Sequence, residues 1–342
     1  MSVGRAGLTR RALIGGGLAL GGAALAGVGT AGYARLVEPG RLVVERVVLP
    51  LAGLPPPLAG LRVVHLSDFH LGPLVPPTHV RAAVDLALAL RPDLVALTGD
   101  FVTQMEDGNV SALVGELPTL VAELSRLRAP LGVFGSLGNH DHWNDPEALT
   151  TAVERAGVRL LRNASATIER DGARLFVAGV DDVWEDQDDL GRALAGVPRD
   201  GVVLLLAHEP DFADEAAEDP RVRAQLSGHS HGGQVKLPGL PRVLPPLGRK
   251  YPEGLYEVGG LRLYTTRGIG VISPGIRLNC PPEVTLLDLA ATRSLDELAA
   301  TRRLSRSSAG RRTSGGRSAP RSARPRRRRP LVRASSLGAL IP

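Results

Sequence analysis

Five short apolar runs in this sequence each end in a polar cluster that contains aspartate or histidine. The runs are rich in β-branched and aliphatic residues, a pattern typical of buried β-strands. The clusters that follow them are Asp68-Phe69-His70, Gly99-Asp100, Gly138-Asn139-His140-Asp141, His208 and Gly228-His229-Ser230-His231. Side chains that follow the carboxyl ends of strands gather at one edge of an open α/β sheet. The sequence therefore predicts a sheet-based fold with one polar site built from five separate segments.

Stretches with helical spacing alternate with these runs. Strands are predicted at Leu61–Leu66, Leu94–Leu97, Leu131–Leu137, Arg174–Val180 and Val202–Ala207. Helices are predicted at Thr78–Leu90 with Thr78 as N-cap, at Val110–Arg126 interrupted by Pro118, and at Pro146–Ala156. After Gln225 the pattern changes to short strands at Gln234–Leu237, Leu255–Val258, Leu261–Thr265 and Glu283–Leu287, and a last helix at Ser294–Ala300. This order predicts an α/β class with mixed sheets rather than a purely doubly wound fold.

The polar clusters have the composition of a metal site. In Asp68-x-His70 and His229-x-His231, the i,i+2 spacing on an extended chain places both side chains on one face. The donors are oxygen and imidazole without thiolate, which suits Mn, Fe or Zn. Cys280 is the sole cysteine, which excludes an internal disulfide framework and a zinc site made of four thiolates.

A single aspartate or histidine after a strand is usually a cap or a solvated loop residue. Five of the eight histidines, however, fall inside these clusters, so unrelated coincidences are a poor explanation. The other three are interpreted differently. His65 lies within a strand and is expected to be a core or supporting histidine, His79 begins a helix and is expected at the surface, and His142 is expected in a loop near the site.

The net charge of +6 is unevenly distributed along the chain. Residues 299–342 hold thirteen arginines and no acidic residue, residues 1–39 carry +3, and residues 40–298 carry −10. An acidic body argues against a nuclease, because it would repel a polyanion. No aromatic residue is interleaved with the tail arginines, so no specific nucleic-acid binding is expected.

The two basic ends predict a three-part chain. Residues 1–39 are typical of a targeting segment, because Arg10 and Arg11 precede 23 residues without formal charge, enough to cross a bilayer that needs about 20. The run Thr9–Ile14 resembles a twin-arginine export signal, and an ordinary anchor is the alternative. In either case the body, residues 40–298, is expected on the extracytoplasmic side. The Arg-rich tail, residues 299–342, is expected to be disordered, and either attaches to anionic lipid or wall polymer or is dispensable.

The full set of motifs resembles that of the calcineurin-like metallophosphoesterases: D-x-H, G-D, G-N-H-D, a single H and G-H-x-H, in this order, within about residues 40–290. Leu66–His70, Gly179–Asp182, Gly228–Gln234 and Pro281–Val284 are similar to the exported or membrane-associated, phosphodiesterase-like subgroup. The resemblance implies a four-layer sandwich of two mixed β-sheets flanked by helices. One position departs from many members, which have a second aspartate where this chain has Thr103.

The resemblance also implies roles for individual residues. Asp68, His70 and His231 would hold one divalent metal ion, Asn139, His208 and His229 a second, and Asp100 would bridge the two. His140 would contact the phosphate or leaving group, and Asp141 would orient His140. A hydroxide bridging two metal ions would then attack phosphorus in line. The expected substrate is a phosphate ester, with a phosphodiester or pyrophosphate, including lipid- or envelope-linked ones, as the first expectation. The alternatives are a phosphomonoesterase, or a non-catalytic envelope-binding module on the same fold.

The substrate and the oligomeric state are not predicted by these motifs. Leu54–Leu58 and Leu237–Tyr251 are Pro-rich and either border the site with apolar side chains for a lipid-linked phosphate or are structural. Trp143 and Trp184 either wall the site or pack elsewhere, and Cys280 either lies near the site or is an ordinary buried thiol.

Overall fold

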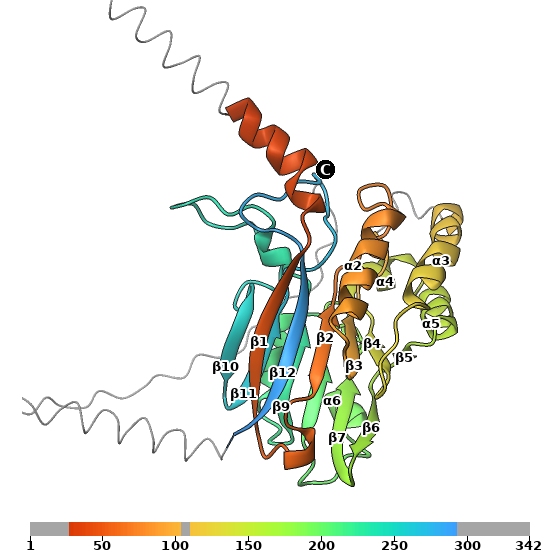
Figure 1. Cartoon of the computed structure of the whole chain (residues 1–342), viewed down its shortest axis with the longest axis vertical. Coiled ribbons are helices and arrows are strands. Elements are labelled where there is room, and N and C mark those ends of the chain that lie inside the picture. The colour runs from red at the N-terminus through yellow and green to blue at the C-terminus, as the bar shows by residue number, and fades with distance from the viewer. Residues whose placement is uncertain (1–26, 104–109, 293–342) are drawn as a thin grey trace, which may run out of the picture. The chain divides into compact units, whose positions relative to one another are not determined.

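A computed structural model of the chain describes residues 27–103 and 110–292, and of residues 110–114 it describes the backbone only. The predicted targeting signal before residue 27, the predicted helix Ser294–Ala300 and the Arg-rich tail lie outside these residues. A helix over residues 27–36 leads into the body (Figure 1). Within the described part of the chain, none of the helices combines the length and the apolar character that crossing a bilayer requires.

Two mixed sheets of six strands form the centre of the body. The first has the order β1 (Val43–Ala52), β12 (Glu283–Thr292), β2 (Arg62–Leu66), β3 (Leu94–Thr98), β4 (Val133–Ser136) and β5 (Arg159–Leu160). The second has the order β10 (Gly254–Val258), β11 (Leu261–Thr265), β9 (Val222–Ser227), β8 (Val203–Leu206), β7 (Ala173–Gly179) and β6 (Ala164–Arg170). In the first sheet only the pairing of β12 with β2 is antiparallel, so β2, β3 and β4 all point to the same edge.

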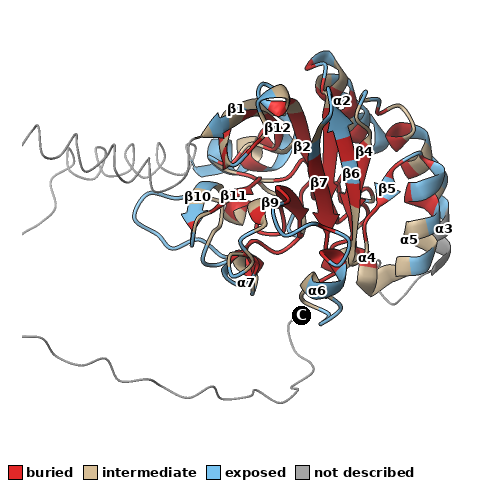
Figure 2. Cartoon of the chain, turned by 90° about the horizontal axis from the view of Figure 1, so that it is seen from below, coloured by how far each residue is buried: buried red, intermediate tan, exposed pale blue. Residues whose placement is uncertain are grey.

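Alternation of side chains along the strands creates three apolar cores. In Figure 2 the central strands are mostly buried, and exposed residues lie on the outer helices and loops. On β2, Val64 faces the helices and Val63 faces the second sheet, because successive side chains point to opposite faces. The outer core of the first sheet is covered by α2 (Pro77–Ala89), α3 (Val110–Leu124) and α5 (Pro146–Arg155). The second sheet is covered by α6 (Leu190–Ala193) and α7 (Ala213–Ala216). The predicted four-layer sandwich of two mixed sheets flanked by helices is confirmed.

Three local predictions are wrong. The segment Gln234–Leu237 is a loop that makes a single bridge between Val235 and Leu278, since its neighbours are Gly and Pro. Thr78 is not an N-cap, because α2 already begins at Pro77. Pro118 does not interrupt its helix, and α3 continues through it. The sequence patterns also missed β1 and β6, whose residues are only partly apolar.

The polar clusters meet at the edge where β2, β3, β4, β8 and β9 end, and we call this the metal-site edge. The chain enters the body at the same edge. Val43 at the start of β1 pairs with Glu283, and β12 runs antiparallel to β2, so the start of β1 lies level with the carboxyl end of β2. The segment that precedes β1 is therefore close to the site.

Candidate metal centre

Left-handed backbone turns the candidate ligands inward from the strand ends. The φ angles of Asp68, His70, Asp100, His229 and His231 are 54°, 47°, 55°, 69° and 50°. Such values are uncommon for residues other than glycine and cluster at functional sites. The expectation that the two i,i+2 pairs lie on extended chain is therefore wrong: their side chains converge because the backbone turns sharply at each of these residues.

Two glycines allow the segments to approach this closely. A Cβ atom on Gly228 would lie 2.3 Å from Asp68 Oδ2, and one on Gly138 would lie 2.5 Å from Asp100 Oδ1. Both distances are far below van der Waals contact, so any side chain would displace a candidate ligand. The glycines that precede Asn139 and His229 are thus required by space rather than by flexibility.

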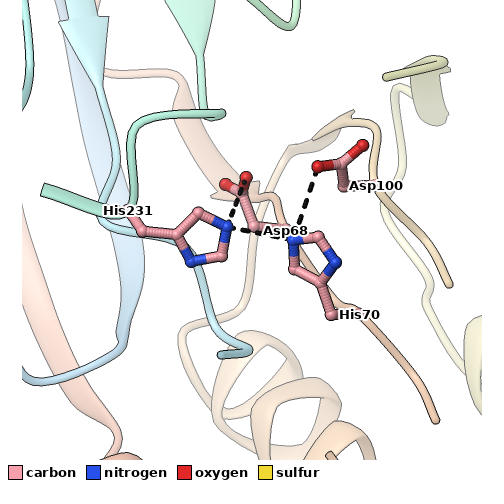
Figure 3. Close-up of side chains that lie close together, drawn as sticks. All are labelled: Asp68, His70, Asp100 and His231. Carbon is pink, nitrogen blue, oxygen red and sulfur yellow. Dashed lines mark hydrogen bonds and ion pairs between the residues drawn. The ribbon is translucent and has the colours of Figure 1, made fainter. Parts of the chain in front are cut away.

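The first ligand group consists of Asp68, His70, Asp100 and His231, all buried (Figure 3). Their donor atoms lie within 4.8 Å of one another. The Nε2 atoms of His70 and His231 face each other at 2.9 Å. Asp68 Oδ1 lies 3.3 Å from His231 Nε2, and Asp100 Oδ2 lies 3.4 Å from His70 Nε2. Four donors that point to one small volume could hold a metal ion.

The second group contains His208 and His229, with Asn139 beside them. His208 Nδ1 donates to the Thr98 carbonyl at 2.5 Å, and His229 Nε2 donates to the Pro246 carbonyl at 2.8 Å. A carbonyl can only accept, so in the neutral ring the opposite nitrogen of each histidine keeps a lone pair for a metal ion. Burial lowers the pKa of His208, but the charge and hydrogen bond of Asp100 outweigh burial and raise this pKa well above its usual value, so a metal ion at His208 Nε2 would take the place of a proton. His229 Nδ1 faces Asn139 Oδ1 at 2.9 Å, which places amide oxygen and imidazole nitrogen together as a second donor set.

Electrostatics favour a divalent cation at this place. Burial raises the pKa of Asp68 to about 6, and the nearby charge of Asp100 also acts in this direction. Burial lowers the pKa of His229 to about 3, which keeps its ring neutral, as a metal ligand must be. Within residues 27–103 and 110–292, the buried Asp68 Oδ2 and His208 Nε2 make no hydrogen bond. The donor set therefore fits two divalent metal ions.

His140 lies beside the first group, with its ring centre 4.7 Å from that of His70. Its backbone N–H donates to Asp100 Oδ1 at 2.9 Å, so the same aspartate fixes its position. Trp143 packs 4.8 Å from the His140 ring, and Trp184 packs 5.5 Å from the ring of His229. The two indoles also contact each other, so both tryptophans wall the site.

Asp141 is fully buried and joins two strand ends. Its Oδ2 accepts from the N–H groups of Asp100 and Gly138 at 2.8 and 3.0 Å, and its Oδ1 accepts from Phe101 at 2.9 Å. Burial and the nearby Asp100 raise the pKa of Asp141 to about 7. These contacts show that Asp141 holds the loops after β3 and β4 together. The orientation of His140 by Asp141 stays a prediction.

Two buried carboxyl groups near the second donor set were not predicted. Glu209 Oε1 lies 4.0 Å from His229 Nδ1, and it forms with His208 and His229 a group whose donor atoms lie within 4.8 Å. Asp182 is buried beside Glu209, and burial raises the pKa of both. The available signal was only that Glu209 follows the candidate ligand His208 in the sequence, and its burial comes from the fold.

Arg277 is the other residue that sequence reasoning missed. It is fully buried and donates to the carbonyls of Gly270, Cys280 and Arg267 at 2.6, 3.0 and 2.7 Å. Its Nη2 also lies 3.4 Å from His231 Nδ1. No motif marks this arginine, since its partners are backbone carbonyls that a sequence does not reveal.

Several secondary predictions are resolved by contacts. Thr103 donates through Oγ1 to the His70 carbonyl at 3.0 Å, so it supports the loop that carries this ligand. Cys280 is buried and its thiol contacts the His231 carbonyl, which makes it both a buried thiol and a neighbour of the site.

The three histidines outside the clusters also have defined places. His65 is a buried core residue bonded to Thr98, as expected. His79 is half-buried, and its ring donates to the Ile269 carbonyl at 2.7 Å, so it is not a plain surface residue. His142 lies in α4 (Asn139–Asn144) rather than in a loop, and it bonds to Asp181 at 2.7 Å.

Comparison with known proteins identifies the family. Residues 61–233 match the calcineurin-like phosphoesterase family model. The chain is 32% identical to the uncharacterized metallophosphoesterase YkuE of Bacillus subtilis over 264 residues, 76% of this chain and 90% of YkuE. It is 34% identical to the phosphodiesterase YaeI of Escherichia coli over 263 residues, 75% of this chain and 92% of YaeI. A third relative, a transmembrane protein with metallophosphoesterase domain from Danio rerio, is 31% identical over 74% of this chain and 58% of that protein. The chain belongs to the calcineurin-like metallophosphoesterases and is a phosphoric ester hydrolase.

Proposed function

We propose that this enzyme hydrolyses phosphodiesters or pyrophosphates at a pair of divalent metal ions. The observation that carries the proposal is the position of Asp100. Its Oδ2 lies 3.4 Å from His70 Nε2 in the first donor group and 3.2 Å from His208 Nε2 in the second. One carboxylate oxygen is thus within reach of both groups, as a bridging ligand must be.

The proposal assigns each donor to one ion. Asp68, His70 and His231 hold the first ion, Asn139, His208 and His229 hold the second, and Asp100 is shared. Mn, Fe or Zn suits this oxygen and imidazole set. When bound, two such ions lower the pKa of a water molecule and neutralise phosphate charge.

His140 then acts on the leaving group. Its backbone is held beside the donors by the N–H bond to Asp100, and its ring packs on Trp143 and against His70. From there it reaches an ester oxygen on the side of the first donor group and delivers a proton to it. General acid catalysis of this kind contributes about 10²- to 10⁴-fold.

A diester is favoured over a monoester by the walls of the site. Trp143 and Trp184 place aromatic rings next to His140 and His229, and these rings offer apolar surface to the second ester group of a diester. The relative from Escherichia coli is itself named a phosphodiesterase.

Hydrolysis of a substrate panel tests the function. Mn-loaded protein is incubated with a chromogenic phosphodiester, a chromogenic monoester, a sugar-nucleotide diphosphate and a phospholipid, with Asp100→Asn as the background control. We expect turnover of the diester or the pyrophosphate, and loss of it in the control. Cleavage of the monoester alone would establish the phosphomonoesterase alternative, and no cleavage by metal-loaded protein would favour the binding module.

We further propose that the enzyme is exported, with residues 1–39 as a twin-arginine-type signal or anchor, residues 40–298 as the catalytic domain and residues 299–342 as an Arg-rich tail that meets an anionic membrane or wall polymer. The Arg10–Arg11 pair and the uncharged run after it support export. The relative from Danio rerio is named a transmembrane protein. Replacing both arginines with lysine should leave the enzyme in the cytoplasmic fraction, and unchanged fractionation would exclude the twin-arginine route.

A further inference from the structure

Exposed apolar side chains are concentrated on two short segments. Among residues 27–103 and 115–292, whose side chains the structure describes, eight large apolar side chains are exposed, and six of these lie in residues 27–37 or 237–243. They are Val28, Leu36, Val37, Leu237, Leu240 and Val243. Val243 is 88% exposed and Leu36 is 81% exposed, so neither contributes to a core. We call these two segments together the apolar rim.

The two segments are attached to the same strip of backbone. The Arg277 N–H donates to the Ala34 carbonyl at 2.9 Å, and the next residue, Leu278, donates to the Gln234 carbonyl at 2.9 Å. The Lys236 N–H donates to the Leu278 carbonyl at 2.8 Å. The helix over residues 27–36 and the base of the loop therefore both bond to the strip formed by residues 277 and 278.

This strip belongs to the metal-site edge. The loop over residues 236–250 begins just after His231, and its Pro246 carbonyl accepts the bond that fixes the ring of His229. Arg277, which holds the strip, reaches His231. The apolar rim is thus beside the candidate metal ligands rather than at a remote surface.

The chemistry of the loop suits the interface of an anionic bilayer. Residues 236–253 contain four basic residues and one acid, Glu253, which pairs with Lys236 and Arg242. The segment itself carries +3 within a body of −10, and of its basic side chains Lys250 also pairs with Asp214 of α7 outside the segment. Pro238, Pro241, Pro245 and Pro246 have no N–H groups, so this backbone loses fewer hydrogen bonds when it leaves water. Exposed aliphatic side chains beside basic ones are typical of membrane-surface segments.

The direction of the chain agrees with this partner. Residues 1–26 precede the rim helix, and the uncharged run from Ala12 continues to Ala34 within it. A chain anchored through this run would bring the metal-site edge, and not the opposite edge, to the lipid surface, since β1 starts at that edge.

We propose that the apolar rim inserts into the headgroup region of an anionic phospholipid bilayer and holds the metal centre toward it. If the metal centre faces the bilayer, the phosphate ester that reaches it is embedded in the membrane and carries an apolar anchor. This conclusion about the substrate rests on the proposed function, whereas membrane insertion of the apolar rim does not.

Insertion is tested without catalysis, on the full chain. In the Leu240→Cys variant, an environment-sensitive dye is attached to the new thiol. The native Cys280 is buried, so the unaltered chain should take up no dye. The matched controls are Val48→Cys, 61% exposed on β1, and Asp171→Cys, in the β6–β7 turn at the opposite edge. The chain is reconstituted in equimolar phosphatidylglycerol and phosphatidylcholine, with and without brominated lipid.

We expect blue-shifted emission and quenching by brominated lipid for the dye at position 240 only. A dye at 240 that stays in water in reconstituted protein overturns the proposal. Equal quenching at 48 and 171 means nonspecific adsorption and also overturns it. A blue shift that grows with protein concentration in the absence of lipid means that a second copy covers the rim, which contradicts the lipid assignment.

A variant separates the rim from the active site. Leu237→Ser/Leu240→Ser/Val243→Ser is compared with the control Val48→Ser/Leu255→Ser, which also removes exposed apolar side chains. We expect the rim variant to keep its turnover of a soluble chromogenic diester and to hydrolyse a vesicle-embedded phosphate ester about tenfold more slowly. Equal rates on vesicles in both variants would contradict the role of the rim. Loss of membrane insertion and loss of catalysis can be told apart, because the dye measures insertion even when the enzyme is inactive.

Discussion

His140 is partly accessible to solvent, whereas the seven candidate metal ligands are buried residues. Replacing His140 with alanine should lower kcat for a diester by about 10²- to 10⁴-fold, since the proton donor is lost. Metal content should be unchanged, because no candidate ligand is removed. Full activity in this variant, with two metal ions bound per chain, would exclude the role.

The identity of the candidate ligands could be predicted from the sequence, but their geometry could not. Asp68-x-His70 and Gly228-His229 can be recognised because metal-binding residue types directly follow a predicted strand. The left-handed backbone at Asp68 and His229 depends on Gly228 and on partners far away in the chain. Glu209 and Arg277 were not predicted as site residues, because their contacts depend on burial in the folded chain, which no local sequence pattern shows.

At the scale of elements, the segment over residues 267–280 is held together by Arg277. Replacing Arg277 with methionine leaves the carbonyls of Gly270 and Cys280 without their donor. Each unsatisfied buried group costs about 1–3 kcal/mol, so we expect a loss of about 3 kcal/mol in the free energy of unfolding. Metal affinity should also fall, because the Gly270 N–H of this segment donates to the Asp68 carbonyl at 2.7 Å and helps to place that ligand. Denaturant titration and metal titration measure both effects.

Arg35 provides the matched control for this variant. It donates to the Gly275 carbonyl at 2.8 Å on the exposed side of the same segment. Arg35→Met should change stability by less than about 1 kcal/mol, because water can replace an exposed donor. Similar losses in the free energy of unfolding for both variants would show that the burial of Arg277 does not determine its contribution to stability.

The contact between α4 and the end of β7 should depend on pH. Burial lowers the pKa of His142, but the hydrogen bond and charge of Asp181 outweigh it and leave the pKa above its usual value. A raised folded-state pKa means that the stabilisation is complete below about pH 6.5 and is lost as pH rises through the folded-state value.

Comparison of the unaltered enzyme with His142→Gln tests this contact. The difference in the free energy of unfolding should be about 1 kcal/mol at pH 6 and should shrink by pH 9. Arg162, which also bonds to Asp181 at 2.7 Å, stays charged over this range and does not contribute to the change. A difference that is constant between pH 6 and 9 would contradict the charged pair.

At the scale of the whole molecule, metal ions should stabilise the fold. The site joins loops from both sheets, and without cations the buried Asp68 and Asp100 repel each other. Binding at 100 times Kd stabilises by about 2.7 kcal/mol. Chelation should therefore lower the Tm by about 5–10 °C. Asp100→Asn should show a much smaller shift on chelation, and an equal shift in both proteins would place the stabilising ion elsewhere.

The layers of the molecule were predictable, and two of its strands were not. The runs around Val63 and Val203 are apolar on both faces, as strands buried between two layers must be. β6 carries polar residues on one face, and the apolar run of β1 is interrupted by the consecutive Glu45 and Arg46; both are edge strands of their sheets. Such half-exposed strands lack the continuous apolar signal and are recognised only when their partners are known.

The position of β12 between β1 and β2 sets the order in which the body can be completed during synthesis. β12 pairs with both neighbours, yet it is the last strand of the described chain and β1 is the first. All seven candidate ligands precede residue 283, so a nascent chain that stops there contains the whole site in its sequence. In that chain β1 would have no partner and β2 would expose an open edge. Closure of the first sheet must therefore wait for the carboxyl-terminal part of the domain to be made.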